Sequence, residues 1–254
     1  MLRIFGALAL LLSVASCGHF KASKDSAVPY IELAEKQLAA GQTPQALSTL
    51  LKGESVDPDN PLIHNQLGLT YFVFVKYEKA ADHFRRAVHI DEKLSEARNN
   101  YARTLIELKQ YSDARAQLEV VVNDLTYLKQ SLAYSNYGLA YFREGQYKKA
   151  IPWLQKSIAA NKNNCLTYTT YGRSLYELKD YRGALPVFDV AVHLCRKSNF
   201  DEAHYFAALT YFKSGDKTRG VSLMNETLLL YPDGPYQKKA QSMLELMRLN
   251  KTGL

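Results

Sequence analysis

Cysteine, tryptophan, proline and glycine are all scarce in this chain. Its 254 residues include 3 Cys, 1 Trp, 8 Pro and 13 Gly. Three cysteines are too few for a fold held together by a disulfide framework, and so few prolines and glycines exclude a collagen-like or low-complexity linker protein. The chain is also 47% apolar and 22% charged, which excludes intrinsic disorder and suffices for a buried core.

The sequence also lacks the short motifs that mark catalytic and cofactor sites. It contains no G-x-S-x-G or G-x-G-x-x-G segment, and no two of its six histidines have the i, i+4 spacing of helical metal ligands. We therefore expect a protein that is not an enzyme and has no catalytic residue, cofactor or metal ligand. The net charge of +7 permits an acidic partner. The pairs of adjacent basic residues are short, however, and we expect no nucleic-acid binding.

The first residues have the pattern of an export signal. Arg3 is the only charged residue among the first twenty, and the apolar run over residues 4–12 is too short for a membrane-spanning helix. Residues 14–17, VASC, resemble the lipobox of bacterial lipoproteins. That resemblance implies a signal peptide over residues 1–16, lipidation of Cys17 and a flexible tether over residues 17–27. An ordinary signal peptide with an unrelated cysteine is the alternative.

The residue after the lipobox cysteine bears on where such a protein resides. In bacterial lipoproteins an Asp at this place favours retention in the inner membrane, whereas this chain has Gly18. The resemblance therefore implies a lipid-anchored protein of the outer membrane that faces the periplasm and is held there by its N-terminal acyl chains.

The rest of the chain repeats one pattern six times. Small residues recur at intervals of 34 or 36 residues, and a second small residue follows each of them by twelve. Large apolar residues surround both at helical spacing, and turn residues lie between them, so each unit is predicted to be a helix-turn-helix hairpin. The first small residues are Ala34, Gly68, Ala102, Gly138, Gly172 and Ala208, and the second are Ala46, Ala80, Ala114, Ala150, Ala184 and Gly220.

This pattern resembles the tetratricopeptide repeat. The second repeat carries the family's residues most completely: Leu67, Gly68, Tyr71, Ala80 and Phe84. The resemblance implies an all-α, right-handed superhelical solenoid with six repeats over residues 28–233. Residues 234–254 are predicted to form a C-terminal capping helix and tail, because they carry an apolar stripe: Tyr236, Ala240, Met243, Leu244 and Met247.

Two cysteines fall in the fifth repeat. Cys165 begins its first predicted helix and Cys195 ends its second, so antiparallel packing brings them to the same end of one hairpin. An exported protein resides where disulfides persist. We therefore predict a Cys165–Cys195 disulfide, the alternative being two unrelated thiols.

The first helix of each repeat lines the concave face in this family, and this implies where a partner binds. Residues three before, one after and four after the first small residue share one helical face. We expect this face to hold an apolar helix or peptide, with about a third of its residues packed between repeats instead. The candidate groove residues are Asn65, Leu69, Phe72, Asn99, Arg103, Ile106, Leu139, Phe142, Arg173 and Tyr176.

The lipobox, the six repeats and the chain length together resemble the PilF/PilW/Tgl pilotins of type IV pilus systems, as does the segment over residues 96–101, EARNNY. The resemblance implies a non-catalytic, monomeric outer-membrane lipoprotein that binds the pilus secretin and promotes its targeting and multimer assembly. Two alternatives remain: an NlpI-like scaffold for peptidoglycan hydrolases and a BamD-like subunit for outer-membrane-protein assembly.

Overall fold

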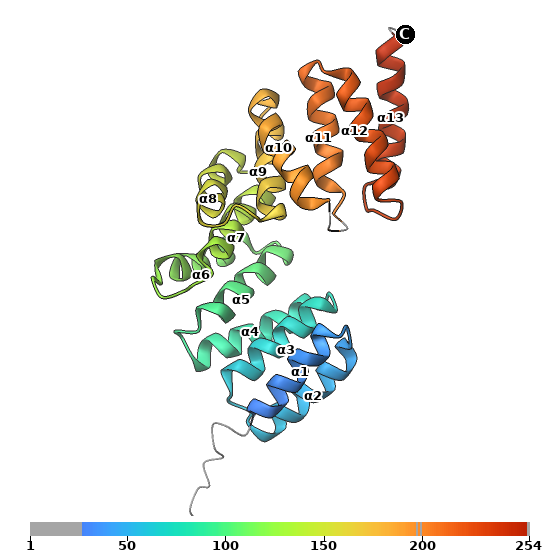
Figure 1. Ribbon diagram of the computed structural model, residues 1–254. Helices are drawn as coiled ribbons and strands as arrows, with labels where there is room; N and C mark the ends of the chain where they lie inside the picture. Colours follow the sequence, from blue (N-terminus) through green and yellow to red (C-terminus); the bar gives the residue numbers. More distant parts are fainter. Residues whose placement is uncertain (1–26, 197, 199, 253–254) are drawn as a thin grey trace, which may run out of the picture.

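The computed structural model describes residues 27–196, 198 and 200–252, and these residues form thirteen α-helices and no strand. Twelve helices pair into six successive hairpins, and the thirteenth packs on the last (Figure 1). The predicted signal peptide and Cys17 lie outside the described residues. The hairpins are α1 (Val28–Ala39) with α2 (Thr43–Val56), α3 (Pro61–Val73) with α4 (Tyr77–Ile90), α5 (Ser95–Glu107) with α6 (Tyr111–Asn123), α7 (Gln130–Arg143) with α8 (Tyr147–Ala160), α9 (Cys165–Glu177) with α10 (Tyr181–Cys195) and α11 (Glu202–Ser214) with α12 (Lys217–Leu230); α13 spans Gln237–Thr252.

Each hairpin turns at a residue in the left-handed backbone conformation. At five of the six turns the next backbone N–H donates to the carbonyl five residues back, the long bond of a Schellman motif. Glycine adopts this conformation without strain, whereas a side chain with a Cβ does so at a cost. The six residues are Gly41, Val75, Lys109, Gly145, Lys179 and Gly215, with φ between 58° and 106°.

The first small residue of each repeat sets how closely its two helices approach. A Cβ placed on Gly68 would lie 2.6 Å from the ring of Phe84, and one on Gly172 would lie 2.8 Å from the ring of Phe188. Both rings are fully buried. Glycine is therefore present where a phenylalanine of the second helix packs directly on the backbone of the first.

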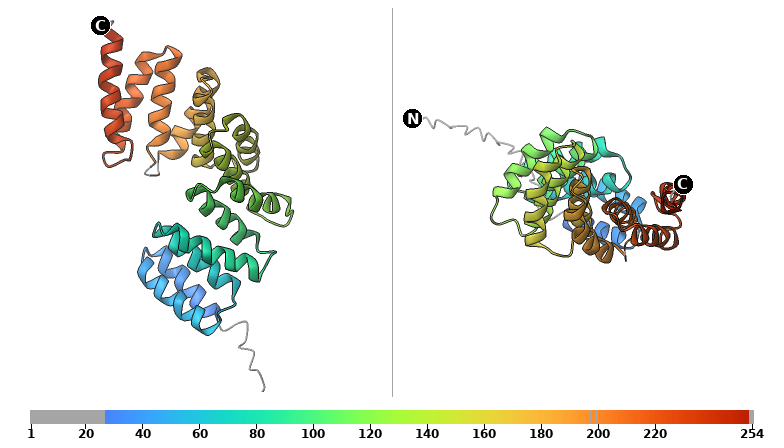
Figure 2. Two further views of the ribbon diagram at one scale, coloured as in Figure 1. Left: turned by 180° about the vertical axis from the view of Figure 1, so that it is seen from behind. Right: turned by 90° about the horizontal axis from the view of Figure 1, so that it is seen from above.

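The hairpins stack into a curved array. Each first helix contacts the first helix of the next repeat, and each second helix packs mainly on the helices that flank it in the chain. Close packing of the first helices places them on the inner side of the curve. The hairpins wind around a common axis, with α1 and α13 at opposite ends (Figures 1 and 2). The predicted superhelical solenoid is confirmed.

A disulfide and a capping helix complete the second half of the array. Cys165 begins α9, Cys195 ends α10, and a disulfide joins them with their Cα atoms 5.2 Å apart, as the sequence predicts. Ala240, Leu244 and Met247 of α13 are buried in the same apolar cluster as Met224 of α12. No helix in the described part of the chain is long and apolar enough to cross a membrane.

Candidate partner-binding groove

The ten residues that the sequence predicts for the groove all lie on first helices of repeats two to five. Half of them are buried between neighbouring helices, more than the third that the sequence pattern leads us to expect. A buried side chain cannot contact a partner, so the exposed lining is narrower than predicted. The buried five are Asn65, Asn99, Ile106, Leu139 and Phe142. The partly exposed five are Leu69, Phe72, Arg103, Arg173 and Tyr176.

The two predicted asparagines join repeats to each other. Nδ2 of Asn100 donates to Oδ1 of Asn65 at 3.1 Å, and Nδ2 of Asn136 donates to Oδ1 of Asn99 at 3.0 Å. Each bond runs from one first helix to the first helix of the preceding repeat. The neighbouring repeat therefore already occupies Oδ1 of Asn65 and Oδ1 of Asn99.

The predicted arginines cover aromatic rings of the inner face. Cζ of Arg103 lies 5.6 Å from the ring centroid of Phe72 in the preceding repeat. Cζ of Arg173 lies between two rings, 4.7 Å from the centroid of Phe142 and 4.3 Å from that of Phe206. The guanidinium of Arg173 therefore replaces part of the apolar surface that the sequence predicts at Phe142.

Aromatic side chains gather where repeats five and six meet the capping helix. The ring centroids of Tyr176 and Phe206 are 5.5 Å apart, and those of Tyr205 and Tyr236 are 4.9 Å apart. Burial raises the pKa of the hydroxyl groups of Tyr176, Tyr205 and Tyr236, so these phenols stay neutral at physiological pH. The cluster is a rigid, amphipathic wall rather than a charged one.

An apolar pocket of about 300 Å³ opens between α9, α11 and α13 beside this wall. From the sequence, Met243 and Met247 are assigned only to the capping stripe. The sequence signal that could have predicted the pocket is Leu246, an apolar residue outside that stripe. In the structure its side chain is 52% exposed. The pocket can take a flexible apolar side chain or one face of a helix. Its lining is Tyr176, Leu209, Phe212, Lys213, Met243, Leu246 and Met247.

A larger and more polar pocket of about 520 Å³ lies beside the ends of repeats four and five. Arg103, Arg143, Asn164 and Glu202 contribute its charged and amide groups, and Phe200 contributes an apolar wall. The two pockets together offer an apolar site and a polar one. The polar one, with both signs of charge, suits the flanks of a peptide rather than a small anion.

Family models place the chain in a general class. Two models described as tetratricopeptide repeat match residues 31–95 and 76–125. A third, described as anaphase-promoting complex, cyclosome, subunit 3, matches residues 124–191. The two tetratricopeptide-repeat matches cover residues 31–125, and the stacked hairpins continue the same repeat fold through the rest of the array.

Comparison with individual proteins gives more specific descriptions than the family models do. The type IV pilus assembly protein PilF of Pseudomonas aeruginosa is 27% identical over 161 residues, which are 63% of this chain and 64% of PilF. The match thus spans less than two thirds of that relative.

Solved structures agree in fold. The PilF structure superposes with a TM-score of 0.73 at 22% identity, over 86% of this chain and 98% of PilF. PilW, described as a widely conserved type IV pilus biogenesis factor, gives 0.77 at 18% identity, over 85% and 98%. The Cut9–Hcn1 hetero-tetramer of the APC/C gives 0.75 at 15% identity, over 87% of this chain and 43% of the other. The fold alone therefore does not select a function.

Proposed function

We propose that the protein is an outer-membrane pilotin of a type IV pilus system, which binds the secretin and promotes its targeting and its assembly into multimers. The observation that carries this proposal is the 27% identity to PilF over 161 residues. Two further features support it: the similarity in fold to PilW, and the lipobox-like segment over residues 14–17. The mechanism consists of binding the secretin and carrying it to the membrane, and no covalent bond is made or broken.

The pocket between α9, α11 and α13 is the proposed binding site for an apolar segment of the secretin. The buried Leu209 and Met247 form its fixed apolar floor, while the partly exposed Met243 is flexible and adapts to different side chains. Burying one leucine or phenylalanine of the partner contributes roughly 1.5–3 kcal/mol. Two such contacts suffice for a specific but reversible hold on the segment.

The pocket is built by α9, α11 and α13, whereas the proposed lipidation site, Cys17, precedes α1 in the chain. Ten residues separate Cys17 from α1, and a fully extended segment of that length spans about 35 Å. The first repeat then stays within that distance of the membrane, while α13 is at the other end of the array (Figure 1). A pocket in this place binds a segment of the secretin in the periplasm. The acyl chains then bring the bound secretin to the outer membrane.

Gene deletion tests the function. A strain without this gene should retain secretin monomers and contain few heat-resistant secretin multimers. Wild-type protein should restore the multimers. A Cys17→Ala protein should restore fewer in the outer membrane, because it has lost its anchor. Normal multimers in the deletion strain would refute the pilotin role and favour the hydrolase scaffold, which pull-down of peptidoglycan hydrolases would then test.

Variants of the pocket test the site. Phe212→Ala combined with Leu246→Ala should weaken binding of the secretin at least tenfold, since about 1.4 kcal/mol corresponds to a decade in affinity. The matched control is Leu229→Ala on α12, which removes a leucine that is 79% exposed and lies outside the pocket. Circular dichroism should show that all variants keep their helix content. Equal affinities for the pocket variant and the control would place the binding site elsewhere.

A further inference from the structure

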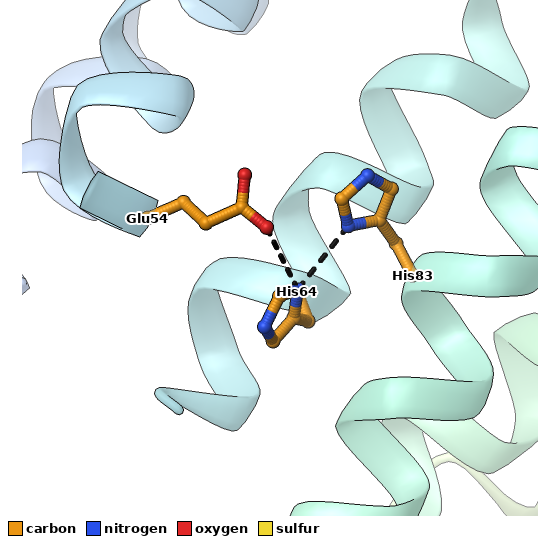
Figure 3. A group of neighbouring side chains, drawn as sticks. All are labelled: Glu54, His64 and His83. Atoms are coloured by element: carbon orange, nitrogen blue, oxygen red, sulfur yellow. Dashed lines mark hydrogen bonds and ion pairs between the residues drawn. The ribbon is translucent and has the colours of Figure 1, made fainter. Parts of the chain in front are cut away.

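Three side chains with metal-binding atoms meet where the first hairpin packs on the second. Glu54 extends from α2, His64 from α3 and His83 from α4 (Figure 3). Nδ1 of His64 lies 3.2 Å from Nδ1 of His83 and 3.6 Å from Oε1 of Glu54, and the three atoms all lie within 4.8 Å of one another. His64 is fully buried, and the other two are half-buried. The sequence does not reveal this group, because its members come from three helices rather than from one.

The backbone fixes which nitrogen of His64 faces the cluster. Nε2 of His64 lies 2.8 Å from the carbonyl oxygen of Pro58. A carbonyl only accepts hydrogen bonds, so Nε2 carries the proton and Nδ1 presents its lone pair to Glu54 and His83. Histidines that bind metal ions characteristically donate their other ring N–H to a carbonyl or carboxylate in this way.

Glu54 departs from the pattern of the repeats. At the position eight residues after the second small residue, the other five repeats all carry an aliphatic residue. A carboxylate that faces the lone pair of a buried imidazole places two acceptors together, which is unfavourable unless a cation or a proton lies between them. Repeat packing alone does not call for such a residue here. The aliphatic residues are Val88, Val122, Ile158, Val192 and Leu228.

The equivalent histidine of the last repeat shows what packing alone requires. His204 occupies the position of His64, and its Nδ1 lies 3.1 Å from the hydroxyl oxygen of Tyr231. The residues equivalent to Glu54 and His83 are Val192 and Leu223 there. One histidine with one tyrosine thus fills this place in the fold, whereas repeats one and two bring together two imidazoles and a carboxylate.

We propose that Glu54, His64 and His83 bind a divalent transition-metal ion, and zinc is the ion we would test. A tetrahedral zinc ion with bonds of 2.0–2.1 Å to nitrogen holds its ligand atoms about 3.3 Å apart, and the observed separations of 3.2 Å and 3.6 Å are close to that value. Two histidines and one glutamate leave the fourth position to water. The ion ties the first repeat to the second, at the end of an array where a terminal repeat has only one neighbour.

One cation of the protein competes for the same carboxylate. Nη1 of Arg86 lies 4.0 Å from Oε1 of Glu54, and Nη2 lies 3.3 Å from Oδ1 of Asp59. Nη2 of Arg86 also donates to the carbonyl oxygen of Pro58 at 2.9 Å, so the guanidinium has partners besides Glu54. Asp82 and Arg85 also lie on α4, but they pair with each other on the surface. Among the described residues, the immediate surroundings of the cluster therefore carry one positive group, and oxygens other than those of Glu54 also hold it.

Zinc titration of the full chain tests the site. The protein is purified through a tag without histidine, stripped with a chelator and titrated with zinc by calorimetry. We expect one ion per chain, and at least tenfold weaker binding in both Glu54→Val and His83→Gln. Glu54→Val introduces the residue type of the other repeats and should fold. His89→Gln, an exposed histidine on the same helix as His83, is the matched control and should bind like wild type.

Thermal unfolding gives an independent readout. Zinc should raise the unfolding midpoint of the wild-type and His89→Gln proteins by more than that of Glu54→Val, because the weakened site stabilises the folded state less by binding. All variants are compared in the same full-length background, so that zinc held by other side chains contributes equally to each. Absence of saturable zinc binding in the wild type would overturn the proposal. So would equal affinity and equal thermal stabilisation in wild type, Glu54→Val and His83→Gln.

Discussion

Cζ of Arg173 lies 4.3 Å from the ring centroid of Phe206, which connects the first helix of repeat five to that of repeat six. On its other side the same guanidinium lies 4.7 Å from the ring centroid of Phe142 in repeat four, and it pairs with the carboxylate of Glu202. The side chain is only 22% exposed. One arginine thus joins three consecutive repeats, so it is part of the architecture as well as of the groove.

Replacing Arg173 by alanine should therefore destabilise the protein. A cation–π contact contributes about 0.5–2 kcal/mol depending on burial, and the change also leaves Glu202 without its partner. We expect Arg173→Ala to lower the free energy of unfolding by about 2–3 kcal/mol, measured by urea denaturation. The control is Arg143→Ala, which removes an exposed arginine of the polar pocket and should change the free energy of unfolding little. Equal effects of the two substitutions would show that the stacking contributes nothing.

Val75 is the one β-branched residue among the six left-handed turn residues, with φ 58°. The left-handed conformation costs a non-glycine residue about 1–2 kcal/mol, and glycine's extra freedom in the unfolded chain costs about 0.5–1 kcal/mol. Val75→Gly should therefore stabilise the protein by about 0.5–1 kcal/mol, seen as a higher midpoint of thermal unfolding. The exposed Val73→Gly, which falls within α3, should destabilise it. A lower midpoint for Val75→Gly would show that Val75 is not strained.

His204 should make stability depend on pH. Burial lowers its pKa to about 4, against 6.5 in the unfolded chain. The stability that the neutral ring contributes is therefore fully present above pH 6.5 and is lost as pH falls toward 4. The difference between the two values corresponds to a total of about 3 kcal/mol.

Urea denaturation at a series of pH values measures this contribution. His204→Gln should lose less stability than wild type between pH 7 and pH 4.5, because its side chain takes up no proton. The control is His193→Gln, which removes an exposed histidine on α10 and should keep the wild-type dependence. His64 and His83 also have a lowered pKa, so some acid sensitivity should persist in every variant. Identical pH profiles for wild type and His204→Gln would contradict the prediction.

The Cys165–Cys195 disulfide should add to stability by restricting the unfolded chain. The two residues are 30 apart in sequence, and closing a loop of that size contributes about 3–4 kcal/mol in the chain-entropy model. Reduction, or the double variant Cys165→Ala and Cys195→Ala, should lower the free energy of unfolding by up to that amount. Thiol counting in denaturant without reductant is the direct check. Two free thiols from this pair in exported protein would refute the bridge.

The architecture could be predicted almost entirely from the sequence. Large apolar residues at helical spacing and small residues at a 34-residue period require helices that pack closely in pairs. The contacts of Gly68 with Phe84, and of Gly172 with Phe188, are the physical reason for that period. The disulfide was predictable for a related reason, since a hairpin necessarily brings the start of its first helix to the end of its second.

Which residues of the inner face are exposed was decided by the tertiary structure. A repeat period specifies the helical face on which a side chain lies, but neighbouring repeats decide whether that face is covered. Asn65 and Asn99 accept hydrogen bonds from the neighbouring repeat, and the guanidinium of Arg173 packs on the ring of Phe142.

Sites that are built from several helices could also not be predicted from the sequence. The apolar pocket needs α9, α11 and α13 together, and the Glu54, His64 and His83 cluster needs three other helices. The sequence by itself determined the helices and their pairing, because these depend on spacing along the chain. Only the tertiary structure decided the exposed groove and the candidate metal site, because both depend on distances between side chains that the chain brings together from different repeats.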